Sequence, residues 1–148
     1  MELRFVDADN RDFRMLTERL DAYYLEALGQ VQLRYAAVNH PKNFACRGVV
    51  YEGEAPIVCG CWKAVDDETA EIKRIYVLPE YRRRGAARLV IRAMEADITA
   101  GGRRRVVLEK ARTTGGSAAL YLALGYRETG YYDSPAGAEN CRCFEKDL

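Results

Sequence analysis

The chain has 148 residues, of which 49% are hydrophobic and 30% charged, and its formal net charge is +1. This length and balance fit one ordinary globular domain over residues 1–148 with a single core. No apolar run approaches the ~20 residues that a membrane span needs, and no apolar segment follows a basic end behind Met1. We therefore expect a cytoplasmic protein with neither a signal peptide nor a membrane partner.

The N-terminal part of the chain predicts a strand and a long helix. A short strand is expected over residues 3–6. Asp9 or Asn10 can then cap a helix, and Gly29 is its expected end. The apolar residues at helical spacing in between are Phe13, Leu16, Leu20, Tyr24, Ala27 and Leu28. Residues 30–45 fit either a second short helix or a loop.

The middle of the chain predicts a meander of three strands. These strands are expected over residues 48–52, 56–65 and 70–77. Gly53-Glu54 and the acidic run 66–68 are turn sequences that separate them. Consecutive strands joined by such short turns pair in the antiparallel sense.

Beyond residue 77 the apolar period changes to that of a helix. Apolar residues from Ala86 to Met94 recur at the i, i+3, i+4, i+7 and i+8 positions, and Gly101-Gly102 ends the helix. The remaining elements are expected to be a strand at 105–109, a helix at 117–124, and strands at 126–131 and 141–145. The order β-α-βββ-α-β-α-β-β predicts an α/β fold in which helices flank a mixed central sheet.

The chain contains five cysteines, and an odd number in a chain without a signal peptide argues against a disulfide framework. They are Cys46, Cys59, Cys61, Cys141 and Cys143. In a strand, each Cys-x-Cys pair directs two thiols to one face and could supply two zinc ligands. Both pairs lie in apolar strand-like runs, however, where a thiol behaves as a small core side chain. We expect no metal.

Charge is unevenly distributed along the chain. Twelve basic and five acidic residues lie between Glu71 and Arg112, whereas the rest of the chain is net acidic. A basic segment in an otherwise acidic chain indicates a polyanionic ligand. A solvated, arginine-rich helix face fits the same distribution.

The most informative segment runs from Ile75 to Ala87, where a strand ends, an Arg- and Gly-rich turn follows and a helix begins. The first N–H groups of a helix have no partner within it and lie at the positive end of its dipole, which suits a phosphate. Small residues at Gly85 and Ala87 let a pyrophosphate approach the backbone. Pyrophosphate binding and an arginine-rich helix start with a permissive glycine both fit this segment alone.

The same segment resembles motif A of the GCN5-related N-acetyltransferase (GNAT) family, whose signature is Gln/Arg-x-x-Gly-x-Gly/Ala. Arg82, Gly85 and Ala87 occupy its defined positions. Residues 71–77 (EIKRIYV) are similar to a strand of bacterial members, and residues 120–126 (LYLALGY) to their Leu-Tyr-x-x-x-Gly-Phe/Tyr motif. The resemblance extends from about Gly48 to the end of the chain, where CFEKDL resembles the last strand of a subgroup.

The resemblance implies a binding site for acetyl-CoA as co-substrate, built on the strand before the turn and on the turn itself. In the family this strand carries a bulge, and its freed backbone pairs with the pantetheine arm. Those backbone groups would come from Ile75, Tyr76 and Val77, with an N–H near Val77 polarising the thioester carbonyl. Backbone N–H groups and arginines of Arg82, Arg83, Arg84, Gly85, Ala86 and Ala87 would hold the pyrophosphate. Thr114 and Ser117 would also contact the cofactor.

The resemblance also implies two catalytic side chains. Glu71 is the candidate general base, acting directly or through a water, because some family members place a catalytic glutamate there. Strand alternation predicts that it shares a face with Lys73, Ile75 and Val77. A solvated residue paired with Lys73 or Arg74 is the alternative. Tyr121 is the candidate general acid beside the sulfur of coenzyme A, although an aromatic residue on a helix commonly packs in the core.

Other polar and aromatic residues favour structural roles. Arg103, Arg104 and Arg105 could reach the 3′-phosphate of coenzyme A, but a solvated cluster at a helix end fits them better. His40, in the break His40-Pro41, is expected to be structural or exposed, and Trp62 to lie in the core. Five tyrosines could line an acceptor pocket, although core packing is favoured for most of them; these are Tyr23, Tyr24, Tyr35, Tyr131 and Tyr132.

The leading hypothesis is an N-acetyltransferase that moves an acetyl group from acetyl-CoA to a primary amine of a small molecule or peptide, by direct attack in a ternary complex. The alternative is a non-catalytic acyl-CoA-binding sensor module, against which Glu71 and Tyr121 argue. Nucleic-acid binding is disfavoured because the net charge is near neutral and no binding motif is present. A homodimer is common in the family, and neither the acceptor nor the oligomeric state is readable from the sequence.

Overall fold

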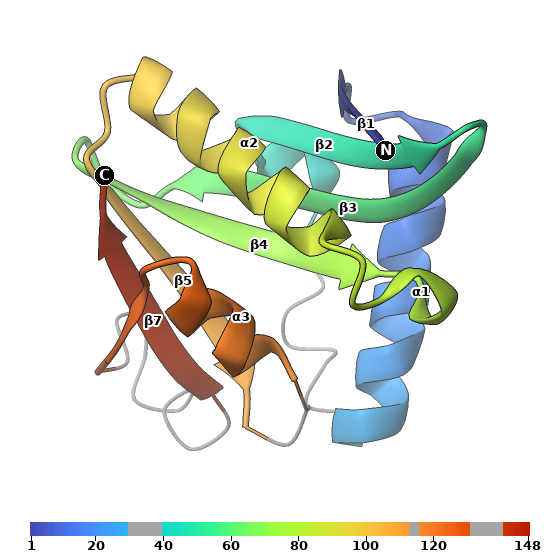
Figure 1. Cartoon of the computed structure of the whole chain (residues 1–148). Coiled ribbons are helices and arrows are strands. Elements are labelled where there is room, and N and C mark those ends of the chain that lie inside the picture. Colours follow the sequence, from blue (N-terminus) through green and yellow to red (C-terminus); the bar gives the residue numbers. More distant parts are fainter. Residues whose placement is uncertain (30–39, 113–115, 131–140) are drawn as a thin grey trace.

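The computed structural model describes residues 1–29, 40–112, 116–130 and 141–148. Its centre is a seven-stranded mixed sheet in the order β1-β2-β3-β4-β5-β7-β6 (Figure 1). The strands are β1 (Glu2–Val6), β2 (Cys46–Glu52), β3 (Ala55–Ala64), β4 (Thr69–Val77), β5 (Arg105–Ala111), β6 (Arg127–Thr129) and β7 (Cys141–Asp147). The helices are α1 (Arg11–Leu28), α2 (Ala86–Ala100) and α3 (Ser117–Ala123), with 3₁₀ turns η2 (Pro41–Asn43) and η3 (Pro79–Tyr81). The predicted element order and fold class are confirmed.

Helix α1 begins and ends where short-range signals in the sequence placed its boundaries. Of the two candidate caps, Asn10 is the N-cap, and its side-chain oxygen accepts a hydrogen bond of 2.9 Å from the N–H of Phe13. Gly29 ends the helix with φ of +63°, a conformation that glycine adopts without steric cost. The apolar face between these ends packs on the sheet, with Phe13, Leu16 and Leu20 buried.

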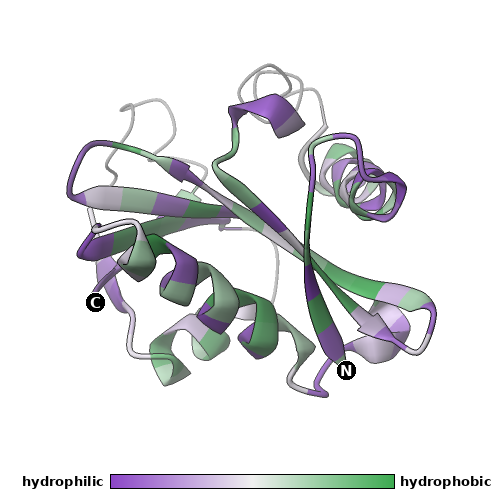
Figure 2. Ribbon diagram, turned by 90° about the horizontal axis from the view of Figure 1, so that it is seen from above, coloured by the Kyte–Doolittle hydropathy of each residue, from purple (hydrophilic) through white to green (hydrophobic). Residues whose placement is uncertain are grey.

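The sheet separates two apolar layers, as the view from above shows (Figure 2). On one face, α1 packs over a cluster that includes Phe13, Leu16 and the thiol-bearing Cys59 and Cys61. On the other face, α2 and α3 cover a larger cluster, whose largest fully buried members include Ile91, Met94, Ile98, Leu108 and Phe144. Strands β2, β3 and β4 therefore direct one row of side chains toward α1 and the other toward the helices on the opposite face.

The parallel contact between β4 and β5 is short. In the described residues, this ladder pairs Thr69 with Arg105, Ala70 with Val106 and Glu71 with Val107, and it contains no later pair. Strand β5 continues instead along β7 as far as Ala111, opposite Cys141. Strand β4 continues along β3 to Val77. The sheet is therefore split between β4 and β5 beyond Glu71.

Several structural expectations for single residues are confirmed. Trp62 is buried, and its indole N–H donates to Asp97 at 2.8 Å. His40 is exposed, and its Nδ1 accepts a hydrogen bond from the N–H of Lys42 at the start of η2. Cys59, Cys61 and Cys143 are buried, whereas the other two cysteines are partly buried. No helix among the described residues is long and apolar enough to span a bilayer.

Candidate functional site

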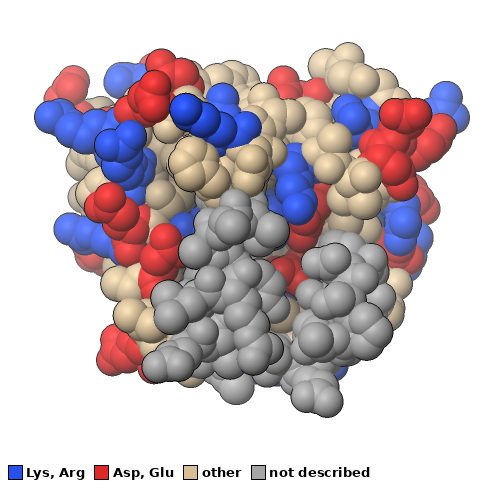
Figure 3. All heavy atoms as spheres, turned by 180° about the vertical axis from the view of Figure 1, so that it is seen from behind, with Lys and Arg blue, Asp and Glu red and all other residues tan. Residues whose placement is uncertain are grey.

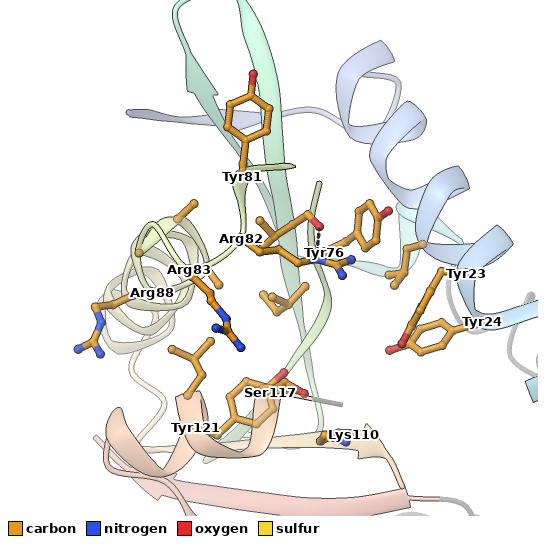
Figure 4. A pocket seen from close by; sticks show the side chains of 18 of the residues that line it. Tyr23, Tyr24, Tyr76, Tyr81, Arg82, Arg83, Arg88, Lys110, Ser117 and Tyr121 are labelled. Carbon is orange, nitrogen blue, oxygen red and sulfur yellow. Dashed lines mark hydrogen bonds between the residues drawn. The ribbon is translucent and has the colours of Figure 1, made fainter. Parts of the chain in front are cut away.

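A cavity of about 700 Å³ occupies the split between β4 and β5. Its volume is in the range of small-molecule and cofactor sites. Strand β4 forms its central wall (Figure 4). The turn before α2 lies at the upper end, α3 and β5 lie at the lower end, and α1 lies across β4 from α2. The lining residues are Leu20, Tyr23, Tyr24, Ile75, Tyr76, Val77, Tyr81, Arg82, Arg83, Gly85, Ala86, Ala87, Arg88, Glu109, Lys110, Gly116, Ser117, Leu120 and Tyr121.

Strand β4 carries the expected bulge, but three residues earlier than Val77. Cys59 pairs with Tyr76 while Cys61 pairs with Lys73, so β4 has one residue more than β3 across this interval. The extra residue lies at Arg74–Ile75, and Arg74 has φ of +61°. This left-handed conformation costs a non-glycine residue roughly 1–2 kcal/mol. The bulge therefore directly precedes Ile75, Tyr76 and Val77, the predicted pantetheine-binding residues.

The bulge also changes which residues of β4 share a face with Glu71. Ile75 and Val77 pack against the cluster beneath α2, whereas Lys73 pairs with Cys61, which faces α1. One inserted residue shifts the alternation, so Glu71 and Lys73 lie on the opposite face from Ile75 and Val77. The expectation of a shared face is therefore correct for Lys73 and wrong for Ile75 and Val77, because it assumed unbroken alternation.

The turn before α2 presents backbone N–H groups to the cavity. Arg83 and Gly85 have φ of +64° and +83°, and successive residues of alternating handedness form a concave nest of N–H groups that binds anions. Gly85 is the N-cap of α2 and offers no side-chain cap. The first backbone bond of α2 runs from the N–H of Leu89 to the C=O of Gly85. The N–H groups of Ala86, Ala87 and Arg88 precede this bond and lie at the positive end of the helix dipole.

The side chains of the turn divide between the cavity and the outside. Arg82 folds back on the strand, where its Nε donates to the C=O of Val77 at 3.2 Å and its guanidinium lies over the ring of Tyr76. Arg83 points into the space between α2 and α3, whereas Arg88 points away (Figure 4). Arg84 does not line the cavity: it stacks on Tyr81 and pairs with Glu52 at 3.7 Å. Its predicted place among the cofactor-binding side chains is not supported by this geometry.

Tyr121 combines both of its expected environments. Its ring is buried, with centroids 5.5 Å from Phe144 and 6.2 Å from Tyr126. Tyr121 also lines the cavity, where its side chain lies beside that of Ser117 (Figure 4). Burial raises the pKa of Tyr121 well above its ordinary range, and the hydrogen bond with Ser117 opposes this shift. The phenol is therefore protonated at neutral pH.

Helix α1 contributes a second aromatic side to the cavity. Tyr23 is 38% exposed, and Tyr24 is partly buried and packs on the α1-side cluster. Their ring centroids are 5.7 Å apart, and both side chains line the cavity. Tyr23 is therefore not one of the tyrosines that pack in the core. Thr114, Tyr35, Tyr131 and Tyr132, which the sequence also proposed for this region, lie outside the described residues.

Sequence reasoning missed Glu109 and Lys110, which lie on β5 beyond its last pairing with β4 and line the cavity. Lys110 is buried, and its Nζ donates to the C=O of Ala111 at 2.8 Å. Burial, followed by the nearby Arg142, lowers the pKa of Lys110. Glu109 and Lys110 both belong to the strand that leads to the helix of Tyr121. The strand was instead expected to end at Glu109, which hid its continuation along the cavity.

Glu71 lies at the edge of the split but not in the cavity lining. It is buried, and its two carboxylate oxygens are 3.7 Å from the ammonium groups of Lys63 and Lys73. The predicted pairing with Lys73 is therefore present, whereas Arg74 pairs with Asp21. A route from Glu71 to the cavity requires a bridging water or a displacement of these lysines.

The arginines after α2 are used for structural contacts. Arg103 donates to the C=O of Asp66 and stacks on Trp62, and Arg105 pairs with Glu145. None of residues 103–105 lines the cavity, as the preferred interpretation expected. Seen from behind, the described Lys and Arg side chains are interspersed with Asp and Glu rather than gathered in one broad patch (Figure 3).

Solved structures share this fold over nearly the whole chain. A protein of Klebsiella pneumoniae assigned as an acyl-CoA N-acyltransferase is 20% identical, with a TM-score of 0.80 and coverage of 99% of this chain and 97% of that one. A GNAT family acetyltransferase of Elizabethkingia anophelis with acetyl-CoA bound is 17% identical, with a TM-score of 0.73 and coverage of 99% and 97%. An aminoglycoside 6′-N-acetyltransferase in complex with coenzyme A is 11% identical, with a TM-score of 0.75 and coverage of 99% and 97%.

The sequence comparisons identify the family. No curated protein sequence matches the chain. The family model of the acetyltransferase (GNAT) family matches residues 5–126, which include the meander, the bulged strand, the turn, α2 and α3. The match covers most of the chain, and the protein therefore belongs to the GNAT family of acetyltransferases.

Proposed function

We propose that the protein transfers an acetyl group from acetyl-CoA to a primary amine by direct attack in a ternary complex. One observation carries the proposal. Freed β4 backbone, the start of helix α2 and the protonated Tyr121 meet in a single cavity of about 700 Å³. A thioester donor that carries a diphosphate needs these three elements: an extended arm site, an anion site and a proton donor. A cytoplasmic location and a homodimer stay predictions from the sequence.

The cofactor would extend from the turn to α3. Its diphosphate would accept hydrogen bonds from the N–H groups of the nest between Arg82 and Ala87, with Arg83 adding charge from the side. Its pantetheine arm would lie along Ile75, Tyr76 and Val77, whose β5 side is outside the ladder. Ser117 lines the far end of this path. An N–H beside the bulge would polarise the thioester carbonyl as charge develops on its oxygen.

The acceptor amine must lose a proton before it can attack. An alkyl ammonium has a pKa near ~10.4 and is mostly protonated at neutral pH. We assign the general base to Glu109, because this acidic residue lines the same cavity as Tyr121. Glu71 is the second candidate and would act through a water, since it lies outside the lining and is flanked by two lysines.

The chemical step would form one bond and break one. The amine nitrogen attacks the thioester carbon, the C–N bond forms, the C–S bond breaks, and the sulfur leaves with the electron pair. The base would pass the first ammonium proton to solvent before the attack and accept the second proton from the nitrogen once the C–N bond has formed. Tyr121 would donate its proton to the departing thiolate and regain one from solvent, so that one proton is released in each cycle. No acyl-enzyme intermediate is needed.

Release of free thiol from acetyl-CoA in a panel of amines tests the proposed function. The panel should contain polyamines, amino acids, amino sugars and peptides with free N-termini. Two structural neighbours justify this breadth: one is an aminoglycoside 6′-N-acetyltransferase and another an N-acetylglutamate synthase. Thiol release that depends on one amine class supports catalysis and names the acceptor. Tight cofactor binding without turnover on any amine would favour the sensor module instead.

A further inference from the structure

The left-handed residue of the β4 bulge is an arginine whose side chain reaches across to helix α1. Arg74 is buried, and one of its terminal nitrogens donates to the C=O of Thr17 at 3.1 Å. The same nitrogen lies 2.8 Å from the carboxylate of Asp21, one turn further along α1. Glycine would adopt φ of +61° without strain. Arginine, in contrast, is strained in this backbone conformation, and the contacts of its side chain with α1 offset that strain.

Two thiols of strand β3 donate hydrogen bonds to the backbone of the same bulge. The thiol of Cys59 donates to the C=O of Arg74 at 3.3 Å, and the thiol of Cys61 donates to the C=O of Lys73 at 3.4 Å. Burial raises the pKa of Cys59 to about 12, so this thiol stays a donor. Between them, Gly60 leaves room for Ile75: a Cβ on Gly60 would lie 2.6 Å from the Cδ1 of Ile75. The sequence Cys59-Gly60-Cys61 thus fits the bulge on both faces of the sheet.

The contact with α1 joins the two sides of the cavity. Thr17 lies one turn before Leu20 and two turns before Tyr24, and both of these residues line the cavity. Arg74 directly precedes Ile75, Tyr76 and Val77, which line it from β4. The guanidinium of Arg74 therefore links the α1 side directly to the β4 side, in addition to the apolar packing of α1 on the sheet.

We propose that Arg74 is a positioning residue: its bonds to Thr17 and Asp21 hold the β4 bulge in the conformation that exposes the backbone of Ile75–Val77 and keep α1 against the site. That this backbone then binds acetyl-CoA rests on the proposed function. If the guanidinium is lost, the bulge samples other conformations. The observed affinity is then the intrinsic affinity multiplied by the fraction of molecules that remain competent to bind.

The variants Arg74→Gly, Arg74→Ala and Arg74→Lys separate the side chain from the backbone. Arg74→Gly removes the guanidinium but adopts the left-handed conformation without strain. Arg74→Ala also removes the guanidinium and keeps the strain of a non-glycine residue at this φ. Arg74→Lys keeps a positive charge but lacks the guanidinium. Arg47→Ala is the matched control. The Arg47 side chain also donates to backbone carbonyls, but these belong to Val6, Pro41 and Phe44 and not to the bulge. Calorimetry would measure the Kd of acetyl-CoA, and hydrogen exchange would measure the amides of Ile75–Val77 in the unliganded protein.

We expect Arg74→Gly to bind acetyl-CoA roughly tenfold more weakly, as a tenfold fall in the competent population would give. Arg74→Ala should bind more weakly still, Arg74→Lys should recover part of the loss, and Arg47→Ala should retain wild-type Kd at a comparable loss of Tm. Amide exchange at Ile75–Val77 should accelerate in Arg74→Gly and not in Arg47→Ala. Wild-type exchange and Kd in Arg74→Gly would overturn the proposal. If the wild type itself ignores acetyl-CoA, the proposed function fails, and the exchange data still decide the role of Arg74.

Discussion

Glu71 and Val107 are the last residues that pair in the parallel ladder between β4 and β5. Every β4 and β5 residue that lines the cavity comes after this pair: Ile75, Tyr76 and Val77 on one strand, Glu109 and Lys110 on the other. The split is the structural origin of the site, because it leaves backbone groups on the β5 side of β4 for a ligand to pair with. It also separates Glu71, at the closed end, from Glu109, within the opening.

Replacing Tyr121 with phenylalanine removes the proton donor and keeps the ring that packs on Phe144. We expect kcat to fall by about 10²-fold, in the range of general acid catalysis, with an unchanged Kd for acetyl-CoA. Because burial raises the pKa of Tyr121 above its ordinary range, the wild-type rate should show no decline from loss of this proton up to pH ~10. Steady-state rates measured against pH would check both results.

Tyr126→Phe is the matched control for that experiment. Tyr126 belongs to the same aromatic cluster, does not line the cavity, and its hydroxyl has no hydrogen-bond partner in the described part of the structure. Its replacement should leave kcat within about twofold, as expected for a hydroxyl that makes no bond to lose. Equal losses in Tyr121→Phe and Tyr126→Phe would assign Tyr121 a packing role alone.

Glu109→Gln and Glu71→Gln distinguish the two candidate bases. Glu109→Gln should lower kcat by about 10²-fold, because Glu109 lines the cavity and is the proposed base. Glu71→Gln should mainly lower the free energy of unfolding, by about 1–3 kcal/mol, because Lys63 and Lys73 lose their shared buried anion. Rates and denaturant unfolding on both variants check this. A larger kcat loss in Glu71→Gln would return the role of base to Glu71.

Most of the fold could be predicted because its signals are local. The cap at Asn10, the stop at Gly29 and the 3.6-residue period of α2 each depend on a few neighbouring side chains. The turn was also predictable, since Gly85 lies between a strand and a helix. The spacing of apolar residues predicts strands and helices but not how they are arranged in space. The family resemblance supplied that arrangement.

The details of the site could not be predicted from the same signals. The bulge at Arg74 depends on the register between β3 and β4, which is a tertiary property, and one inserted residue reversed the predicted face of Glu71. The cavity position of Glu109 depends on where β5 leaves β4. Arg84 turns to Glu52, which is distant in sequence. Each outcome is set by a non-local pairing that spacing along the chain does not reveal.

Glu145 gives the folded state a pH-dependent contribution outside the site. Hydrogen bonding to Arg105, and the charge of Arg127, hold the pKa of this carboxyl below its ordinary value. Since the pKa is lower folded than unfolded, the stabilisation is complete above the unfolded value near ~4.3 and is lost as pH falls through the folded value. Glu145→Gln should lower unfolding free energy by about 0.5–1 kcal/mol at pH 7.

The difference between wild type and Glu145→Gln should then shrink in urea titrations below pH ~4, where the wild-type carboxyl takes up its proton. A difference that stays constant from pH 7 to pH 3 would show that the substitution acts through packing and not through charge.

Calorimetry of acetyl-CoA with Gly85→Glu and Gly102→Glu tests the anion-binding turn most directly. Both glycines have left-handed φ, +83° and +91°, a Cβ on either would meet no atom within 4 Å, and they lie at opposite ends of α2. Both substitutions therefore carry a similar backbone cost, but only Gly85→Glu places a carboxylate beside the diphosphate site. We expect Gly102→Glu to bind like the wild type and Gly85→Glu to lose at least ~10²-fold in affinity. Equal affinity in the two variants, or no binding by the wild type, would contradict the account.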